Sequence, residues 1–106
     1  GATRVEPRAD VTTQLVPMLE GLVRNRNTVA IDMITDGVDH SGKSPDQVTI
    51  PDHVLVTIVI TRPNPNRRRP TLEDVLAAAN TWDAVSGITV TTVAEYPGFW
   101  RALGRR

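Results

Sequence analysis

The stretch 54–61, which reads VLVTIVIT, is the strongest strand signal in the chain and decides the expected fold. Side chains alternate between the two faces of a β-strand, so one face carries only Val and Ile and the other carries Leu, Thr and Val. Neither face carries a charge, which is typical of a strand paired on both sides. We therefore expect a central strand over 54–61.

Two further segments are predicted to be strands. Residues 28–35 alternate Val29, Ile31 and Met33 with Ala30, Asp32 and Ile34, and residues 88–96 are rich in Thr and Val. A loop rich in Asp, Gly, Ser and Pro separates the first of these strands from 54–61, with room for a short strand over 48–50.

Two helices are expected, one before the first strand and one after the central strand. The first begins near Asp10 or Thr13, ends at 25–27, and has apolar residues at helical spacing: Val11, Leu15, Met18, Leu19, Leu22 and Val23. Pro17 requires either a kink or a regular part that begins close to it. The second is predicted to start with a capping box of Thr71 and Asp74 and to end at Ser86-Gly87, and its apolar face holds Leu72, Val75, Leu76, Ala79 and Trp82.

The predicted element order is therefore α-β-β-α-β. The simplest packing is an α+β two-layer sandwich, with a small, mostly antiparallel sheet of three to four strands and two helices on one face. The connection through the second helix is long enough to be a crossover that makes the last strand parallel to the central one. Residues 1–106 are expected to form one domain, with 1–9 as an extended lead-in and 97–106 as an aromatic and basic tail.

Composition excludes several classes of function. The 12 basic and 12 acidic residues balance, so binding to nucleic acid or to an anionic membrane would need a local patch. Without cysteine there is no disulfide, thiolate metal site or cysteine nucleophile. No apolar run reaches the ~18 residues of a spanning helix, and no leader pattern opens the chain, so we expect a soluble protein, cytoplasmic or part of a particle assembled there.

Residues 37–44 match the phosphate-loop pattern G-x-x-x-x-G-K-S after a predicted strand. A phosphate loop requires a helix immediately afterwards, because amides of its first turn hold the phosphates. Pro45 and Pro51 exclude a long helix there. The match is interpreted as fortuitous, and no other pattern of catalytic residues is present, so no enzyme activity is predicted.

The same loop region contains six side chains able to bind metals: Asp36, Asp39, His40, Asp46, Asp52 and His53. Their spacing fits neither a calcium loop nor a paired-histidine zinc site. We expect solvated loop charges, with no metal and no cofactor. Asp32, midway along a strand, is expected to face solvent.

A basic connection, Arg62, Arg67, Arg68 and Arg69, precedes the second helix. Helix N-termini favour anions and arginine binds phosphate or carboxylate, so these residues are candidates for contact with an anionic partner. The alternative is a solvated loop neutralised by Glu73 and Asp74.

The tail contains Phe99, Trp100 and Leu103 after a Pro-Gly break. Aromatic residues and arginine are enriched at binding hot spots, so these three could dock on a partner. They could equally fold back and cover the chain's own sheet.

A helix-first order with a long loop before the central strand resembles the small α/β subunits that form rings at the head-to-tail junction of long-tailed phages. The resemblance implies a ring-forming structural protein of the virion. The first functional hypothesis is thus a non-catalytic assembly subunit, homo-oligomeric or bound to another protein. The alternative is a nucleic-acid-binding module that uses the basic connection.

Overall fold

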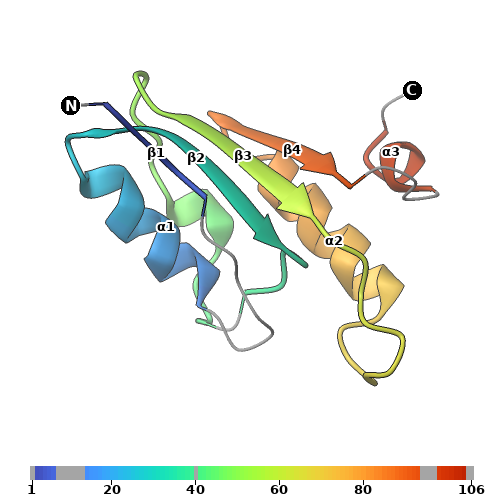
Figure 1. Ribbon diagram of the computed structural model, residues 1–106. Coiled ribbons are helices and arrows are strands. Elements are labelled where there is room, and N and C mark those ends of the chain that lie inside the picture. Colours follow the sequence, from blue (N-terminus) through green and yellow to red (C-terminus); the bar gives the residue numbers. More distant parts are fainter. Residues whose placement is uncertain (1, 7–13, 40, 94–97, 105–106) are drawn as a thin grey trace.

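The fold is built on one four-stranded sheet, shown in Figure 1. The computed structural model describes residues 2–6, 14–39, 41–93 and 98–104. In chain order the elements are β1 (Thr3–Val5), α1 (Leu15–Arg24), β2 (Thr28–Thr35), the 3-10 helix η1 (Pro45–Gln47), β3 (Leu55–Ile60), α2 (Leu72–Asp83), β4 (Ile88–Thr92) and α3 (Phe99–Ala102).

All pairings in this sheet are parallel, and the strands follow in the order β1-β2-β3-β4. The prediction of an α+β sandwich with a mostly antiparallel sheet is therefore wrong, and the protein is a small α/β domain. Parallel neighbours require a crossover connection, usually a helix. Here α1 and α2 provide two crossovers, and the segment containing η1 provides the third without a full helix.

The strand predictions hold apart from the first and last residues. β2 covers 28–35 as predicted, β3 is central as predicted, and the crossover through α2 does make β4 parallel to β3. β4 ends at Thr92, and residues 94–96 of the predicted range 88–96 lie outside the described residues. Residues 48–50 are not a strand.

The predicted lead-in holds the edge strand β1, which pairs with β2. Three residues are too few to show an alternation that sequence reading can detect. Because β1 precedes α1, the order is not helix-first, and the resemblance to phage ring subunits loses the feature on which it rested.

α1 accommodates Pro17 without a kink, because its regular part begins at Leu15. Pro17 is then the third helical residue, in the first turn, where backbone N–H groups have no partner within the helix. The predicted caps Asp10 and Thr13 lie outside the described residues. The side chain of Gln14, the observed N-cap, makes no capping hydrogen bond.

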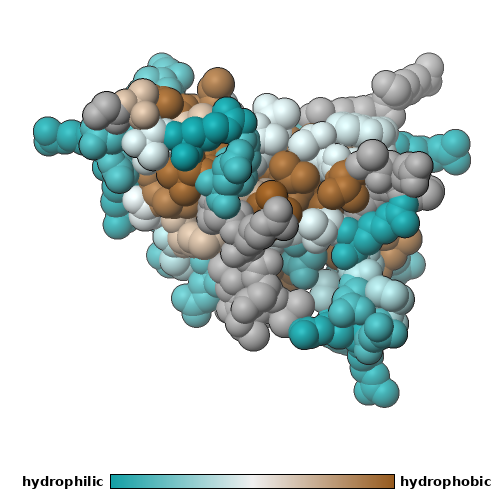
Figure 2. All heavy atoms as spheres, viewed as in Figure 1, coloured by the Kyte–Doolittle hydropathy of each residue, from teal (hydrophilic) through white to brown (hydrophobic). Residues whose placement is uncertain are grey.

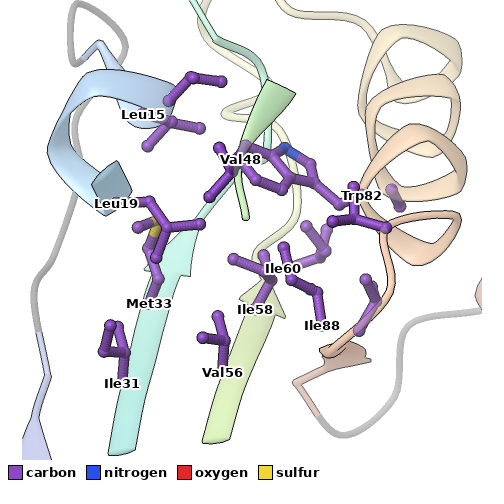
Figure 3. Packing of buried hydrophobic residues seen from close by; sticks show 14 of the residues in the cluster. Leu15, Leu19, Ile31, Met33, Val48, Val56, Ile58, Ile60, Trp82 and Ile88 are labelled. Atoms are coloured by element: carbon purple, nitrogen blue, oxygen red, sulfur yellow. The ribbon is translucent and has the colours of Figure 1, made fainter. Parts of the chain in front are cut away.

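The hydrophobic core lies between the helices and one face of the sheet, as Figure 3 shows. The strands contribute alternate residues to it: Ile31, Met33, Val56, Ile58, Ile60, Ile88 and Val90. The helices cover them with Leu15, Val16 and Leu19 of α1 and with Val75, Ala79 and Trp82 of α2. Leu72, predicted on the same helix face, is instead 48% exposed.

No described helix covers the other face of the sheet, which we call the open face. In Figure 1 the strands pass in front of α2, and in Figure 2 apolar and weakly polar atoms gather over the middle of this side. By the alternation of the strands, it carries Arg4, Ala30, Asp32, Ile34, Leu55, Thr57, Val59, Thr89 and Thr91. Leu55 is the most exposed large apolar residue of the strands, at 72%.

Candidate functional site

The loop 37–44, which follows the carboxyl end of β2, does not have the geometry of a phosphate loop. Four of its backbone amides are bonded to side chains of neighbouring residues. Gly37 N donates to Thr35 Oγ1 at 3.0 Å, Val38 N to Asp36 Oδ1 at 2.9 Å, and Lys43 N to Ser41 Oγ at 3.1 Å. The only helical turn that follows is η1, of three residues. These amides are not available to hold a phosphate.

Asp39, at the centre of this loop, ties it to α1. Its Oδ1 accepts from the backbone N–H of Val16 at 3.1 Å, and its Oδ2 accepts from the N–H and the hydroxyl of Ser41. Val16 is in the first turn of α1, where amides lack partners within the helix. Asp39 is therefore a capping residue supplied from a distant part of the chain.

Gly37 fixes the loop to α2. The Trp82 indole Nε1–H donates to the Gly37 carbonyl at 2.8 Å. Gly37 has φ of 82°, and an added Cβ would lie 2.9 Å from Ile60 Cδ1 and 3.5 Å from Ala78 Cβ. Only glycine allows the backbone to approach the core this closely with this φ.

A cavity of about 610 Å³ lies where the loop after β2 meets the start of α2. Its lining is mostly apolar, from Gly37, Val38, Pro45, Pro70, Ala77, Ala78, Thr81 and Trp82. Four charged side chains complete it: Asp39, Lys43, Arg69 and Asp74. The cavity lies beyond the carboxyl end of β2 and beside the helix that follows β3.

The N-terminus of α2 is closed by its own side chains. Thr71 N donates to Asp74 Oδ2 at 2.9 Å, and Asp74 N donates to Thr71 Oγ1 at 3.2 Å, which is the predicted capping box. Hydrogen bonds from the Thr71 backbone and side chain, with a smaller effect of the Arg69 charge, lower the pKa of Asp74. Asp74 is thus a carboxylate near neutral pH, and this helix end is less open to an external anion than the sequence suggested.

The four arginines of the basic connection are all exposed: Arg62, Arg67, Arg68 and Arg69. Only Arg69 lines the cavity. The structure therefore divides the predicted anion-binding group, leaving Arg67 and Arg68 outside the cavity.

The predicted docking residues of the tail have different environments. Phe99 is fully buried in the core, and Leu103 is half-buried against it. Trp100 is 40% exposed, and its ring meets that of Phe99 edge to face at 5.0 Å. Phe99 and Leu103 fold back on the protein, which was one of the two expectations for the tail. Of the three residues, Trp100 is the one that presents a large aromatic surface.

Two observations limit other kinds of site. Within the described ranges, no three His, Cys, Asp or Glu side chains are grouped so that they could hold a metal ion. His40 lies outside those ranges. No helix in the described part of the chain has the length and apolar character needed to cross a membrane.

The charged residues described on the open face, Arg4 and Asp32, are paired with each other. Arg4 donates to the Asp32 carboxylate and lies 3.6 Å from that of Glu6. Asp32 is on the face predicted for it, but its side chain is only 17% exposed. The sequence prediction placed both helices on one face of the sheet, but it did not identify the opposite face as a candidate site, although the uncharged Leu55, Thr57 and Val59 were a signal of it.

Comparison of the chain with protein-family models, curated proteins and solved structures finds no match.

Proposed function

We propose that this protein is a non-catalytic assembly subunit that associates with a second copy of itself through the open face of its sheet. The observation that carries the proposal is that α1 and α2 both pack on the other face. All-parallel sheets are almost always covered on both faces, because their strands are apolar on both sides. Here the second side presents Leu55, Thr57 and Val59 with no described helix over them.

The chemistry of the open face favours a copy of the same chain as the partner. Arg4 is paired with Asp32 and lies near Glu6 within one molecule, so the charged residues described on this face already have partners. The formal net charge is zero, so two copies do not repel each other at long range. A two-fold axis places the same patch against itself, and two sheets pack face to face about 10 Å apart.

The test is the mass in solution, measured by light scattering and by sedimentation over a range of protein concentrations. The double variant Leu55→Lys/Thr91→Lys places two like charges on the open face, and we expect it to raise the dissociation constant at least about tenfold. Asn80→Lys/Ser86→Lys adds the same charge at two exposed positions outside that face and should associate like the natural chain.

Circular dichroism shows whether the variants fold, so that lost association is not confused with unfolding. A natural chain that stays monomeric at high concentration would overturn the proposal, as would association that both double variants reduce equally. A short DNA duplex tests the alternative function. Binding that disappears in Arg67→Ser/Arg68→Ser/Arg69→Ser, in a chain that remains monomeric, would favour the nucleic-acid module.

A further inference from the structure

We infer that the cavity between the loop after β2 and the start of α2 is a binding site for a small organic monocarboxylate with an apolar body. This inference concerns a different part of the molecule from the open face. It rests on the size of the cavity, its apolar lining and the state of its four charged groups.

The apolar lining is formed by small residues that leave space beside a large one. Ala77 and Ala78 of α2 and Gly37 of the loop lie at the cavity, and Trp82 lines it next to them. The Trp82 indole N–H is bonded to the Gly37 carbonyl, which fixes the almost fully buried ring next to the cavity. A volume of about 610 Å³ is within the range of small-molecule sites, and such sites are mostly apolar with a few polar groups that orient the ligand.

The two carboxylates at the cavity are already occupied by protein donors. Asp39 accepts hydrogen bonds from Val16 and from Ser41, and Asp74 accepts one from Thr71. Their charge therefore serves to cap α1 and α2, and a cationic ligand would have to compete with those backbone amides.

The two cations at the cavity retain donors for a ligand. The Lys43 ammonium lies 3.3 Å from Glu20 Oε1, and an ammonium has three N–H groups, so two remain. Arg69 makes no side-chain hydrogen bond within the described ranges, and a guanidinium binds a carboxylate with two parallel bonds. The groups with spare hydrogen-bonding capacity thus select an anion.

The charge balance selects a singly charged anion over a phosphate ester. Lys43 is paired with Glu20 and the Arg69 charge acts on Asp74, so the cavity has no surplus of positive charge with which to hold a dianion beside Asp39 and Asp74. The amides of Gly37, Val38 and Lys43 are bonded to side-chain oxygens of Thr35, Asp36 and Ser41, so these three do not bind phosphate oxygens. A carboxylate held by Arg69, with its apolar body against Ala77 and Ala78, fits all of these conditions.

The experiment is a titration of the ¹⁵N-labelled full chain with phenylacetate, followed by NMR. We expect saturable shifts of the Trp82 indole N–H and of the Ala77 and Ala78 amides. Phenylacetamide, which has the same body without the charge, should bind at least about tenfold more weakly, because the charge-assisted bonds are lost. Inorganic phosphate should not shift these resonances at the same concentrations.

Matched variants separate this site from general charge effects. Arg69→Ser should weaken phenylacetate binding about tenfold, whereas Arg67→Ser, an exposed arginine outside the cavity, should not. Ala77→Leu fills the cavity from an exposed helix position and should abolish the shifts, whereas Ala84→Leu, at the end of the same helix and outside the cavity, should leave them.

Each remaining outcome overturns the inference. Phenylacetate shifts that do not saturate, or that spread over the surface, would mean that the cavity holds no ligand. Equal losses in Arg69→Ser and Arg67→Ser would mean that Arg69 has no special role. Binding of phosphate as tight as that of phenylacetate would show a simple anion site that makes no use of the apolar lining.

Discussion

Ile58 and Leu55 lie three residues apart in β3 and have opposite environments. Ile58 is fully buried between the sheet and the helices, and Leu55 is 72% exposed on the open face. The alternation of a strand places them on different faces, so similar side chains make different contributions to the free energy of unfolding.

We predict that Ile58→Ala lowers the free energy of unfolding by about 2 to 5 kcal/mol, the range for removing a large aliphatic side chain from a packed core. Leu55→Ala, a truncation of similar size in the same strand, should cost less than about 1 kcal/mol in the monomer. Chemical denaturation at low protein concentration measures both. Similar losses in the two variants would mean that β3 is not packed on one side only.

At the scale of the element, the two longer helices begin in different ways. α2 carries its own start signal, since Thr71 and Asp74 are three residues apart and bond each other reciprocally. Sequence reading found this box because both partners lie within four residues. For α1 the sequence offered Asp10 or Thr13 as the cap and a regular part that begins close to Pro17. It did not point to the observed partner of the first turn, Asp39, which is distant in the chain.

The capping box should make stability depend on pH in the acid range. The bonds from Thr71 hold the pKa of Asp74 below its ordinary value of 3.8, so the ionised form stabilises the fold. This contribution is fully present above that ordinary value and is lost as the pH falls through the lower, folded-state value.

We therefore predict that Asp74→Asn is less stable than the natural chain at pH 7 and that the difference shrinks below pH 3.8, as measured by thermal unfolding. Glu73→Gln removes a neighbouring charge and leaves both bonds of the box, so it should reproduce only a small part of the loss. A difference that stays constant across this range of pH would show that the charge of Asp74 does not stabilise the helix.

At the scale of the whole molecule, the sequence predicted the three longer strands and the two longer helices, but not the direction of β3 relative to β2. The strand over 28–35 was predicted in full, because its alternation runs for eight residues. The direction of β3 relative to β2 depends on the connection between them, and only the three-residue η1 interrupts it. Without a helix pattern there, a parallel crossover was not expected, and the antiparallel prediction followed.

The same lack of local signal limited the prediction of the cavity. Lys43 and Arg69 come from segments on either side of β3, and only the folded chain brings both to the cavity. The phosphate-loop pattern lies in the loop that lines the cavity. The bonded amides of this loop, however, do not support phosphate binding.

The strand order predicts a gradient of protection in hydrogen exchange. β3 is paired on both sides, whereas β1 is a three-residue edge strand paired only with β2 in the described part of the chain. We expect the amides of 55–60 to exchange slowest and those of 3–5 to exchange faster, on the order of a hundredfold or more, as measured by NMR. Equal protection of both would mean that β1 has a further partner.

The bond between Asp39 and Val16 also has a consequence for the order in which the protein is made. Residues 15–24 are synthesised before Asp39, so α1 emerges from the ribosome without the carboxylate that caps its first turn. A ten-residue helix is marginal alone in water, and Gln14 makes no side-chain capping bond. α1 must therefore wait for the strand and loop that follow it, whereas α2 emerges with its start signal already present.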